Sequence, residues 1–130
     1  MKILNKILKV LLTLILVTPV MGLFQNMQPT AEMYGTPEAF AFIQMMMSSG
    51  YLNYLILVVF LISAVCLWTG RVALASLLIL PITVNIIGFH AFLDGGLFKA
   101  GAVMGNILLL LNVYFLYQSR NQLKPLFIRN

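Results

Sequence analysis

The side chains best suited to chemistry in this chain are polar residues within long apolar stretches, and His90 is the foremost of them. Its imidazole could bind a metal, transfer a proton or hydrogen-bond a quinone oxygen. A lone histidine at the end of an apolar segment is more often a hydrogen-bonding group at a membrane interface. The chain has one histidine and one cysteine, Cys66, so it forms neither an intrachain disulfide nor a metal cage from its own His and Cys residues. The residues therefore define no catalytic centre and no metal site.

Two asparagines occupy matching positions in consecutive apolar stretches. Counted at about 1.5 Å per residue, Asn85 and Asn106 each lie about 4 to 5 Å to the outer side of the centre of their segment. Antiparallel helices would place them at the same depth. We therefore predict a hydrogen bond between the two side chains, worth about 0.6 to 2 kcal/mol in a membrane. In the alternative, both amides line a polar pocket for the headgroup of a ligand.

Pro81 interrupts the third apolar stretch near its middle. It removes one backbone hydrogen bond and its ring pushes on the preceding turn, so a helix is expected to kink there. Such openings are tolerated where they line a cavity. We therefore expect a small cavity near Thr83, Asn85 and His90, and Asn106 joins these three as a candidate ligand-binding residue.

Three glycines provide small surfaces for helix packing. Gly101 and Gly105 are four residues apart and share one helix face, and Gly88 lies at a similar depth on the preceding stretch. We expect these glycines, together with Pro81, to shape the packing of helices within the chain. The Gly101/Gly105 face could equally form the contact of a homodimer.

The composition is that of a membrane protein. Of 130 residues, 62% are hydrophobic and 8% are charged, and the mean hydropathy is +1.01. Water-soluble domains contain far more charged residues. At about 20 residues per span, the length admits one all-α domain, an antiparallel bundle of four transmembrane helices that contacts the lipid bilayer. The predicted spans cover about residues 7–24, 51–69, 72–93 and 101–117, and a basic cytoplasmic tail covers residues 118–130.

Two segments near the start of the chain need separate interpretation. The basic and then apolar residues 1–22 fit either a first span or a cleaved signal peptide. In the long loop that follows, Thr36, Pro37 and Glu38 have the order of an N-cap, a first-turn proline and a first-turn acid. They predict a short apolar helix over residues 37–48, which lies at the membrane interface or covers the outer end of the bundle.

The charged residues predict how the spans are oriented. Cytoplasmic loops of membrane proteins carry an excess of Lys and Arg. With both termini in the cytoplasm, seven of the eight basic residues are cytoplasmic, whereas Lys99 and all three acidic residues lie outside. Topology thus explains the net charge of +5, and the scattered basic residues form no patch for nucleic acid. No charged residue lies within the core of a predicted span, which counts against a proton-coupled transporter.

Several motifs resemble, in order and spacing, the small bacterial DoxX-like membrane proteins over about residues 15–127. The most specific motif consists of Pro81, Asn85, Phe89 and His90. The shorter ones are Pro37-Glu38-Ala39, Ser49-Gly50-Tyr51, Thr69-Gly70-Arg71 and Lys124-Pro125-Leu126-Phe127. The resemblance implies a multi-pass, four-helix protein of the bacterial inner membrane, in a family named after a subunit associated with thiosulfate:quinone oxidoreduction.

The resemblance also directs the functional hypotheses. DoxX-like proteins commonly have an acidic residue in the second span and a glycine four positions later, where this chain has Phe60 and Ala64, so no activity that needs that carboxylate is expected. The leading hypothesis is a non-catalytic accessory subunit of a quinone-linked redox or redox-stress complex; a quinone is the cofactor that such a role would admit, but the sequence itself requires none and leaves the cofactor unknown. The alternative is a small-solute or lipid transporter that acts as a homo-oligomer. Thiol-disulfide chemistry needs paired cysteines, so any enzymatic role would rest on His90.

Overall fold

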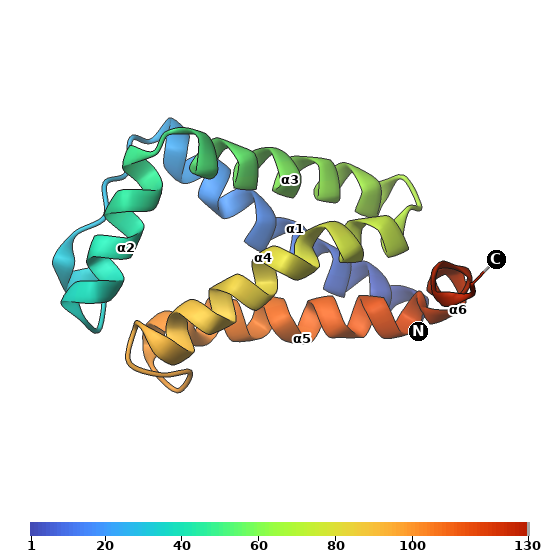
Figure 1. Ribbon diagram of the computed structural model, residues 1–130. Helices are drawn as coiled ribbons and strands as arrows, with labels where there is room; N and C mark the ends of the chain where they lie inside the picture. Colours follow the sequence, from blue (N-terminus) through green and yellow to red (C-terminus); the bar gives the residue numbers. More distant parts are fainter. Residues whose placement is uncertain (130) are drawn as a thin grey trace.

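The computed structural model describes residues 1–129, which form a series of helices joined by short connections (Figure 1). No β-strand is present in this range, so the predicted all-α class is confirmed. Short 3-10 helices are labelled η. In chain order the helices are α1 (Lys2–Phe24), η1 (Ala31–Met33), α2 (Pro37–Ser48), α3 (Tyr51–Trp68), α4 (Val72–Phe92), η2 (Ala100–Ala102), α5 (Val103–Gln118), α6 (Arg120–Leu123) and η3 (Lys124–Phe127).

Four helical stretches are long and apolar enough to cross a membrane. They are α1, α3, α4 and the continuous stretch Ala100–Gln118, which joins η2 to α5. Large hydrophobic side chains cover their outer surfaces, such as Leu14, Val65 and Leu110, which are 61%, 62% and 69% exposed. Extended apolar surfaces are unusual on proteins in water and are expected where lipid covers them. The chain is therefore a helical membrane protein.

Local sequence signals define the ends of the inner helices. The Ala39 backbone N–H donates a hydrogen bond to Thr36 Oγ1 at 3.1 Å, so this threonine caps α2. Pro37 follows as the first residue of α2, where a helix needs no donor. Gly70 has a φ of 81°, a left-handed conformation that suits glycine. It allows the short connection between Trp68 and Val72 in which the chain reverses direction (Figure 1).

The helix boundaries differ from the expected ones mainly near the two ends of the chain. α1 begins at Lys2, before the predicted start at residue 7, because the intervening residues contain neither glycine nor proline to prevent helix formation. The predicted tail contains α6 and η3, and Asn130 lies outside the described residues. α4 continues through Pro81 as one helix and changes direction near its middle (Figure 1), as an internal proline requires.

The helices pack around a core of large aliphatic and aromatic side chains. α1 packs on α3 and α5, and α4 packs on both α3 and α5. The contact between α4 and α5 is closest at Gly105, where a Cβ atom would lie 2.8 Å from Cγ2 of Ile86. The largest side chains that are fully buried include Leu12, Leu16, Leu67, Ile79 and Phe115.

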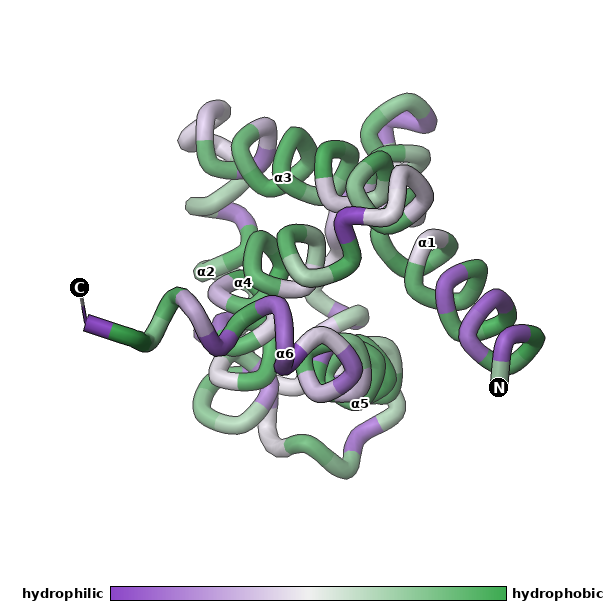
Figure 2. Tube along the Cα trace, turned by 90° about the vertical axis from the view of Figure 1, so that its right-hand side faces the viewer, coloured by the Kyte–Doolittle hydropathy of each residue, from purple (hydrophilic) through white to green (hydrophobic). Residues whose placement is uncertain are grey.

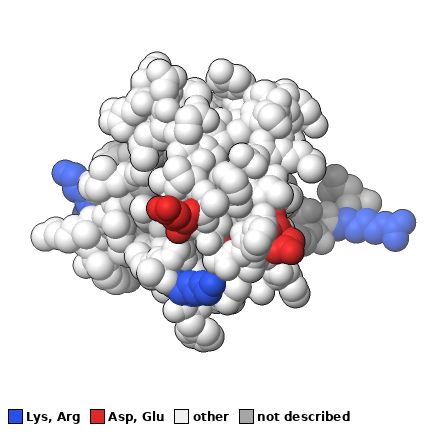
Figure 3. All heavy atoms as spheres, turned by 90° about the vertical axis from the view of Figure 1, so that its left-hand side faces the viewer, with Lys and Arg blue, Asp and Glu red and all other residues white. Residues whose placement is uncertain are grey.

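The two ends of the molecule differ in polarity and charge. Both chain termini and the turn between α3 and α4 lie at one end, whereas α2 and the loop between α4 and α5 lie at the other (Figure 1). Hydrophilic residues gather in the first turns of α1 and in α6 at the end that faces the viewer in Figure 2. Acidic side chains stand out on an otherwise largely uncharged surface at the opposite end (Figure 3). We refer to that opposite end as the α2 end.

Candidate ligand pocket

A pocket of about 750 Å³ lies between α2, α3 and α4, with one residue of α1 at its edge. Small-molecule sites typically have volumes of about 300 to 1,000 Å³. The pocket reaches from the α2 end to about the middle of α3 and α4, because Phe60 and Pro81 are among its lining residues. Its apolar wall includes Phe42, Ile56, Leu57, Ile82, Ile86 and Phe89.

Two amide side chains provide free polar groups in this pocket. Asn53 of α3 and Asn85 of α4 both line it. Within residues 1–129, the asparagine side chains that form hydrogen bonds are those of Asn5, Asn106 and Asn112. The amides of Asn53 and Asn85 therefore have no protein partner in this range. Each amide offers two donor hydrogens and one acceptor oxygen. None of the described Asp, Glu, Lys and Arg residues lines the pocket, which therefore suits an apolar molecule with an uncharged hydrogen-bonding group.

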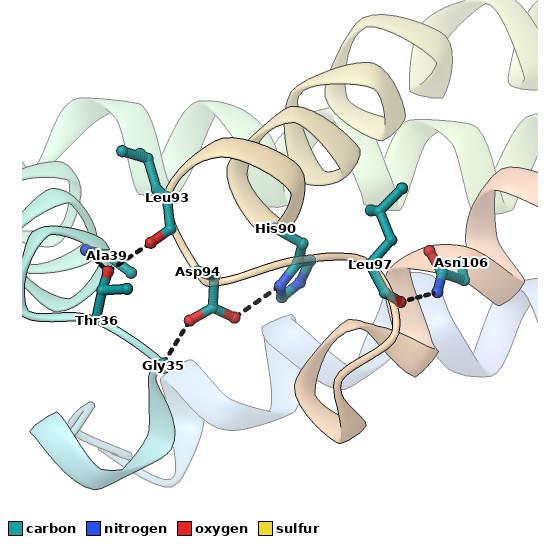
Figure 4. Close-up of polar contacts among 8 residues, drawn as sticks. All are labelled: Gly35, Thr36, Ala39, His90, Leu93, Asp94, Leu97 and Asn106. Carbon is teal, nitrogen blue, oxygen red and sulfur yellow. Dashed lines mark hydrogen bonds and ion pairs between the residues drawn. The ribbon is translucent and has the colours of Figure 1, made fainter.

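His90 and Asp94 form a polar junction beside the pocket. His90 Nδ1 lies 2.8 Å from Asp94 Oδ2, and the Gly35 backbone N–H donates to Asp94 Oδ1 at 2.7 Å (Figure 4). Asp94 is only 3% exposed. A carboxylate buried to this extent needs such partners, because an unpaired charge in an apolar environment is costly. The two contacts connect the end of α4 to the segment before α2.

Thr36 makes a second connection between α2 and the end of α4. Its hydroxyl donates to the Leu93 carbonyl while its oxygen accepts the capping hydrogen bond of α2 (Figure 4). Phe89 of α4 also contacts Phe42 of α2, with ring centroids 5.7 Å apart. Aromatic pairs at this separation are favourable. Together these contacts hold α2 in place as the end wall of the pocket.

Tyr34 completes this junction from the connection between η1 and α2, outside the long helices. Its ring makes an edge contact with Phe89 at a centroid separation of 6.2 Å. Burial raises the pKa of the Tyr34 phenol above its ordinary value, and the nearby negative charge of Asp94 raises that pKa further. Tyr34 therefore remains neutral and can act as a hydrogen-bond donor at the rim of the pocket.

The structure places two of the four candidate ligand-binding residues, Asn85 and His90, in the pocket wall. Thr83 is fully buried and does not line the pocket. Its hydroxyl donates to the Ile79 carbonyl of the same helix at 2.9 Å. Because this bond satisfies the hydroxyl within α4, Thr83 is not available to a ligand in that pocket.

Asn106 also lies apart from the pocket. Its Nδ2 donates to the Leu97 carbonyl at 2.7 Å and so holds the loop between α4 and α5 against the start of α5 (Figure 4). The predicted hydrogen bond between Asn106 and Asn85 is therefore wrong. The reason is that the loop folds back onto the first turns of α5, and its Leu97 carbonyl accepts from the Asn106 amide.

The glycines differ in their packing roles. Gly105 is buried against α4, close to Ile86 and to the Nε2 edge of His90. At Gly101 an added Cβ would make ordinary contact with Asp94 Oδ2 at 3.7 Å. At Gly88 it would meet no atom within 4 Å, so within this chain a larger residue would fit at that position. The Gly101/Gly105 face is thus directed at α4 and its C-terminal loop in the same chain.

Two residues of this region were not anticipated as site residues. Asp94 lies four positions after His90, a spacing that brings side chains together on one helix face, so the pair was detectable in the sequence. Asn53 gave a weaker signal, because a single amide near the start of an apolar stretch is common. Its role emerges only when α2 and α4 are placed around it.

A scan against protein-family models and searches of curated proteins and of solved structures found no match to this chain. The class of the protein therefore rests on its own fold and pocket. It is a helical membrane protein with a pocket that the short helix α2 closes on one side. None of the described Asp, Glu, Lys and Arg residues lines this pocket.

Proposed function

We propose that this chain is a DoxX-like accessory subunit of a quinone-linked redox or redox-stress complex in the bacterial inner membrane, and that it holds a quinone between α2, α3 and α4. The pocket carries the proposal, because it combines apolar walls with two unpaired amides. A quinone is uncharged and presents carbonyl oxygens, to which asparagine N–H groups can donate. The residues of the most specific DoxX-like motif support the same site, since all of them line it: Pro81, Asn85, Phe89 and His90.

In this proposal His90 is a positioning residue and takes no part in chemistry. Its Nδ1 is held by Asp94, and its Nε2 lies toward Gly105 of α5, 3.8 Å from the position of a Cβ atom there. The imidazole therefore orients the end of α4 and leaves quinone binding to Asn53 and Asn85. This arrangement supports an accessory role over an enzymatic one.

The proposed topology is an antiparallel bundle of four transmembrane helices with both termini in the cytoplasm. Support comes from the spatial distribution of charge. Seven of the eight basic residues belong to the terminal segments and the α3–α4 turn, which share one end of the molecule, while Lys99 and the acidic residues belong to the α2 end. At 12 residues α2 is too short to span a bilayer, so in this topology it lies at the outer interface.

The core supports retention of residues 1–22 as the first span in preference to a cleaved signal peptide. Leu12 and Leu16 of α1 are almost completely buried within the main hydrophobic cluster. Removing α1 would expose the facing surfaces of α3 and α5, on which it packs. An N-terminal mass of the purified protein that includes these residues would agree with this topology, and one that lacks them would contradict it.

Transport as a homo-oligomer through the Gly101/Gly105 face is the competing proposal, and it has less support. Close helix packing at small residues needs a free face on each partner. Gly105 already packs against Ile86 of α4, so a second chain would have to displace an internal contact.

The proposal is tested by purifying a C-terminally tagged protein in mild detergent and identifying the quinones and proteins that accompany it by mass spectrometry. Asn85→Phe places an aromatic ring in the pocket from an exposed position of α4. Val84→Phe is the matched control, because Val84 is 58% exposed and does not line the pocket. We expect quinone and a redox partner with the wild type and with Val84→Phe, and loss of quinone with Asn85→Phe. Wild-type protein free of quinone, or equal quinone in all three, would refute the proposed site.

A further inference from the structure

A second pocket of about 620 Å³ adjoins the first one at the α2 end. Met45 of α2 and Asn53 of α3 line both pockets, so these two side chains lie at the boundary between them. The second pocket also contacts Gln28 and Pro29, which belong to the connection between α1 and η1. It therefore leads from the apolar pocket toward the loops at this end of the molecule.

The two pockets differ in the chemistry of their walls. The second one combines the amides of Gln28, Gln44 and Asn53 and the hydroxyl-bearing side chains of Ser48 and Tyr54 with apolar residues such as Leu23 and Met47, so its wall is of mixed polarity. Gln28 and Gln44 are exposed, so their amides can hydrogen-bond a bound molecule. From there, Asn53 to Phe60 covers about 10 Å along α3 at 1.5 Å per residue, and this stretch of α3 lines the apolar pocket. A compartment of mixed polarity and an apolar compartment thus follow one another along α3.

Neither pocket is lined by any of the described Asp, Glu, Lys and Arg residues. A phosphate or carboxylate headgroup is bound most strongly by Arg, Lys or other cationic donors, and burying it without them is costly. The charged groups at this end are three acids and one lysine, so the surrounding field also disfavours an anion (Figure 3). Amides, in contrast, match hydroxyl, carbonyl and amide groups.

We infer that the two pockets together form a binding site for an uncharged amphiphile, with its polar head among Gln28, Gln44 and Asn53 and its apolar tail between α3 and α4. This inference rests on the proposed function, because it presupposes that the apolar pocket binds a ligand. It adds that the head must be uncharged and that it extends past Asn53 to the loop side, toward Gln28 and Gln44. Met45 lines both the head and the tail compartments.

The test uses the full chain in nanodiscs of neutral lipid and two radiolabelled probes with the same tail, farnesol and farnesyl phosphate, with empty nanodiscs as the background. We expect farnesol to bind at least tenfold more tightly than farnesyl phosphate. Gln44→Leu and Asn53→Leu should each weaken farnesol binding about fivefold, the loss of one neutral hydrogen bond. Gln25→Leu is the control, since Gln25 is exposed at the same end and lines neither pocket.

The outcomes separate this inference from the proposed function. If farnesyl phosphate binds as tightly as farnesol and Asn85→Phe blocks both, the apolar pocket binds ligands but the uncharged head site is refuted. If farnesol binds and neither Gln44→Leu nor Asn53→Leu differs from Gln25→Leu, the placement of the head is refuted. If neither probe binds above background while quinone still co-purifies with the wild type, this inference falls and the proposed function stands; if quinone is absent as well, both fall. Because Gln44 is exposed, its substitution tests the head site even if Asn53→Leu does not fold.

Discussion

Asp94→Ala removes the acceptor of two contacts that fix the end of α4 to the segment before α2. Asp94 accepts from the Gly35 N–H at 2.7 Å and pairs with His90 Nδ1 at 2.8 Å. Hydrogen bonds to charged groups contribute about 1.5 to 3 kcal/mol each. Part of that loss is offset, because the variant no longer buries a carboxylate away from water. Because Asp94 is 3% exposed, water cannot replace the carboxylate without local rearrangement. We therefore expect the free energy of unfolding to fall by about 2 to 4 kcal/mol.

Two further variants separate the contributions of the hydrogen bond and the charge. Asp94→Asn keeps an oxygen that can accept from Gly35 but loses the negative charge beside His90, so we expect about half the effect of Asp94→Ala. Glu32→Ala removes an exposed acid from the same end, and no contact in the described part of the chain depends on it. Its effect should be within about 0.5 kcal/mol, as for ordinary surface substitutions.

The assay is unfolding in mixed micelles with increasing sodium dodecyl sulfate, followed by helical circular dichroism, together with amide hydrogen exchange of residues 35–48. Loss of the junction should speed exchange in α2 more than in α3 or α5, because local opening follows the local contacts. If Asp94→Ala unfolds at the same detergent fraction as Glu32→Ala and exchange in α2 is unchanged, Asp94 does not hold α2 over the pocket and the reasoning is refuted.

Three other predictions test the pKa and packing arguments. The folded protein should lose stability as the pH rises above the ordinary tyrosine pKa of about 10. Burial and the neighbouring Asp94 carboxylate raise the Tyr34 pKa in the folded state, so the phenol of the unfolded chain loses its proton first. In alkaline unfolding curves, Tyr34→Phe should therefore show a smaller loss of stability. Gly105→Ala should lower the free energy of unfolding by about 1 to 3 kcal/mol, because the added Cβ would lie 2.8 Å from Ile86 Cγ2. Gly88→Ala should leave stability unchanged or raise it in the same detergent assay, because its Cβ would meet open space. Asn112→Leu should change stability by less than about 1 kcal/mol or increase it, since it removes one hydrogen bond but also a buried carbonyl without a partner among the described residues; a larger loss would show that this carbonyl has a partner, such as a buried water.

Fold class and helix positions could be predicted from the sequence because they depend on short-range properties. Long runs of apolar residues specify helices in a bilayer, where every backbone polar group must be satisfied within its own segment. Local signals defined several ends: Thr36 and Pro37 begin α2, and Gly70 provides the left-handed turn after α3. The separation of basic from acidic residues along the chain likewise needed no tertiary information, since it follows from their order in the sequence.

The site was only partly predictable because it depends on how the helices pack. Depth along the helices singled out Asn85 and Asn106, and side-chain chemistry singled out His90; of these, Asn85 and His90 lie in the pocket wall. Asn106 lies apart from the pocket because its amide donates to a loop carbonyl, and Thr83, which the expected cavity beside Pro81 included, donates to a carbonyl of its own helix. Depth does not reveal the rotation of a helix about its axis, and that rotation decides which side chains meet.

The sequence by itself determined that this protein is all-helical and rich enough in apolar residues for four helices to cross a membrane, because hydrophobicity and helix signals are local. Only the tertiary structure decided that Asn53 and Asn85 face one pocket, that Gly105 approaches α4 while Gly88 does not, and that α2 is fixed over the pocket through Asp94. The physical reason is that these features depend on contacts between residues far apart in the chain, which form only when the crossing and rotation of the helices are fixed by packing.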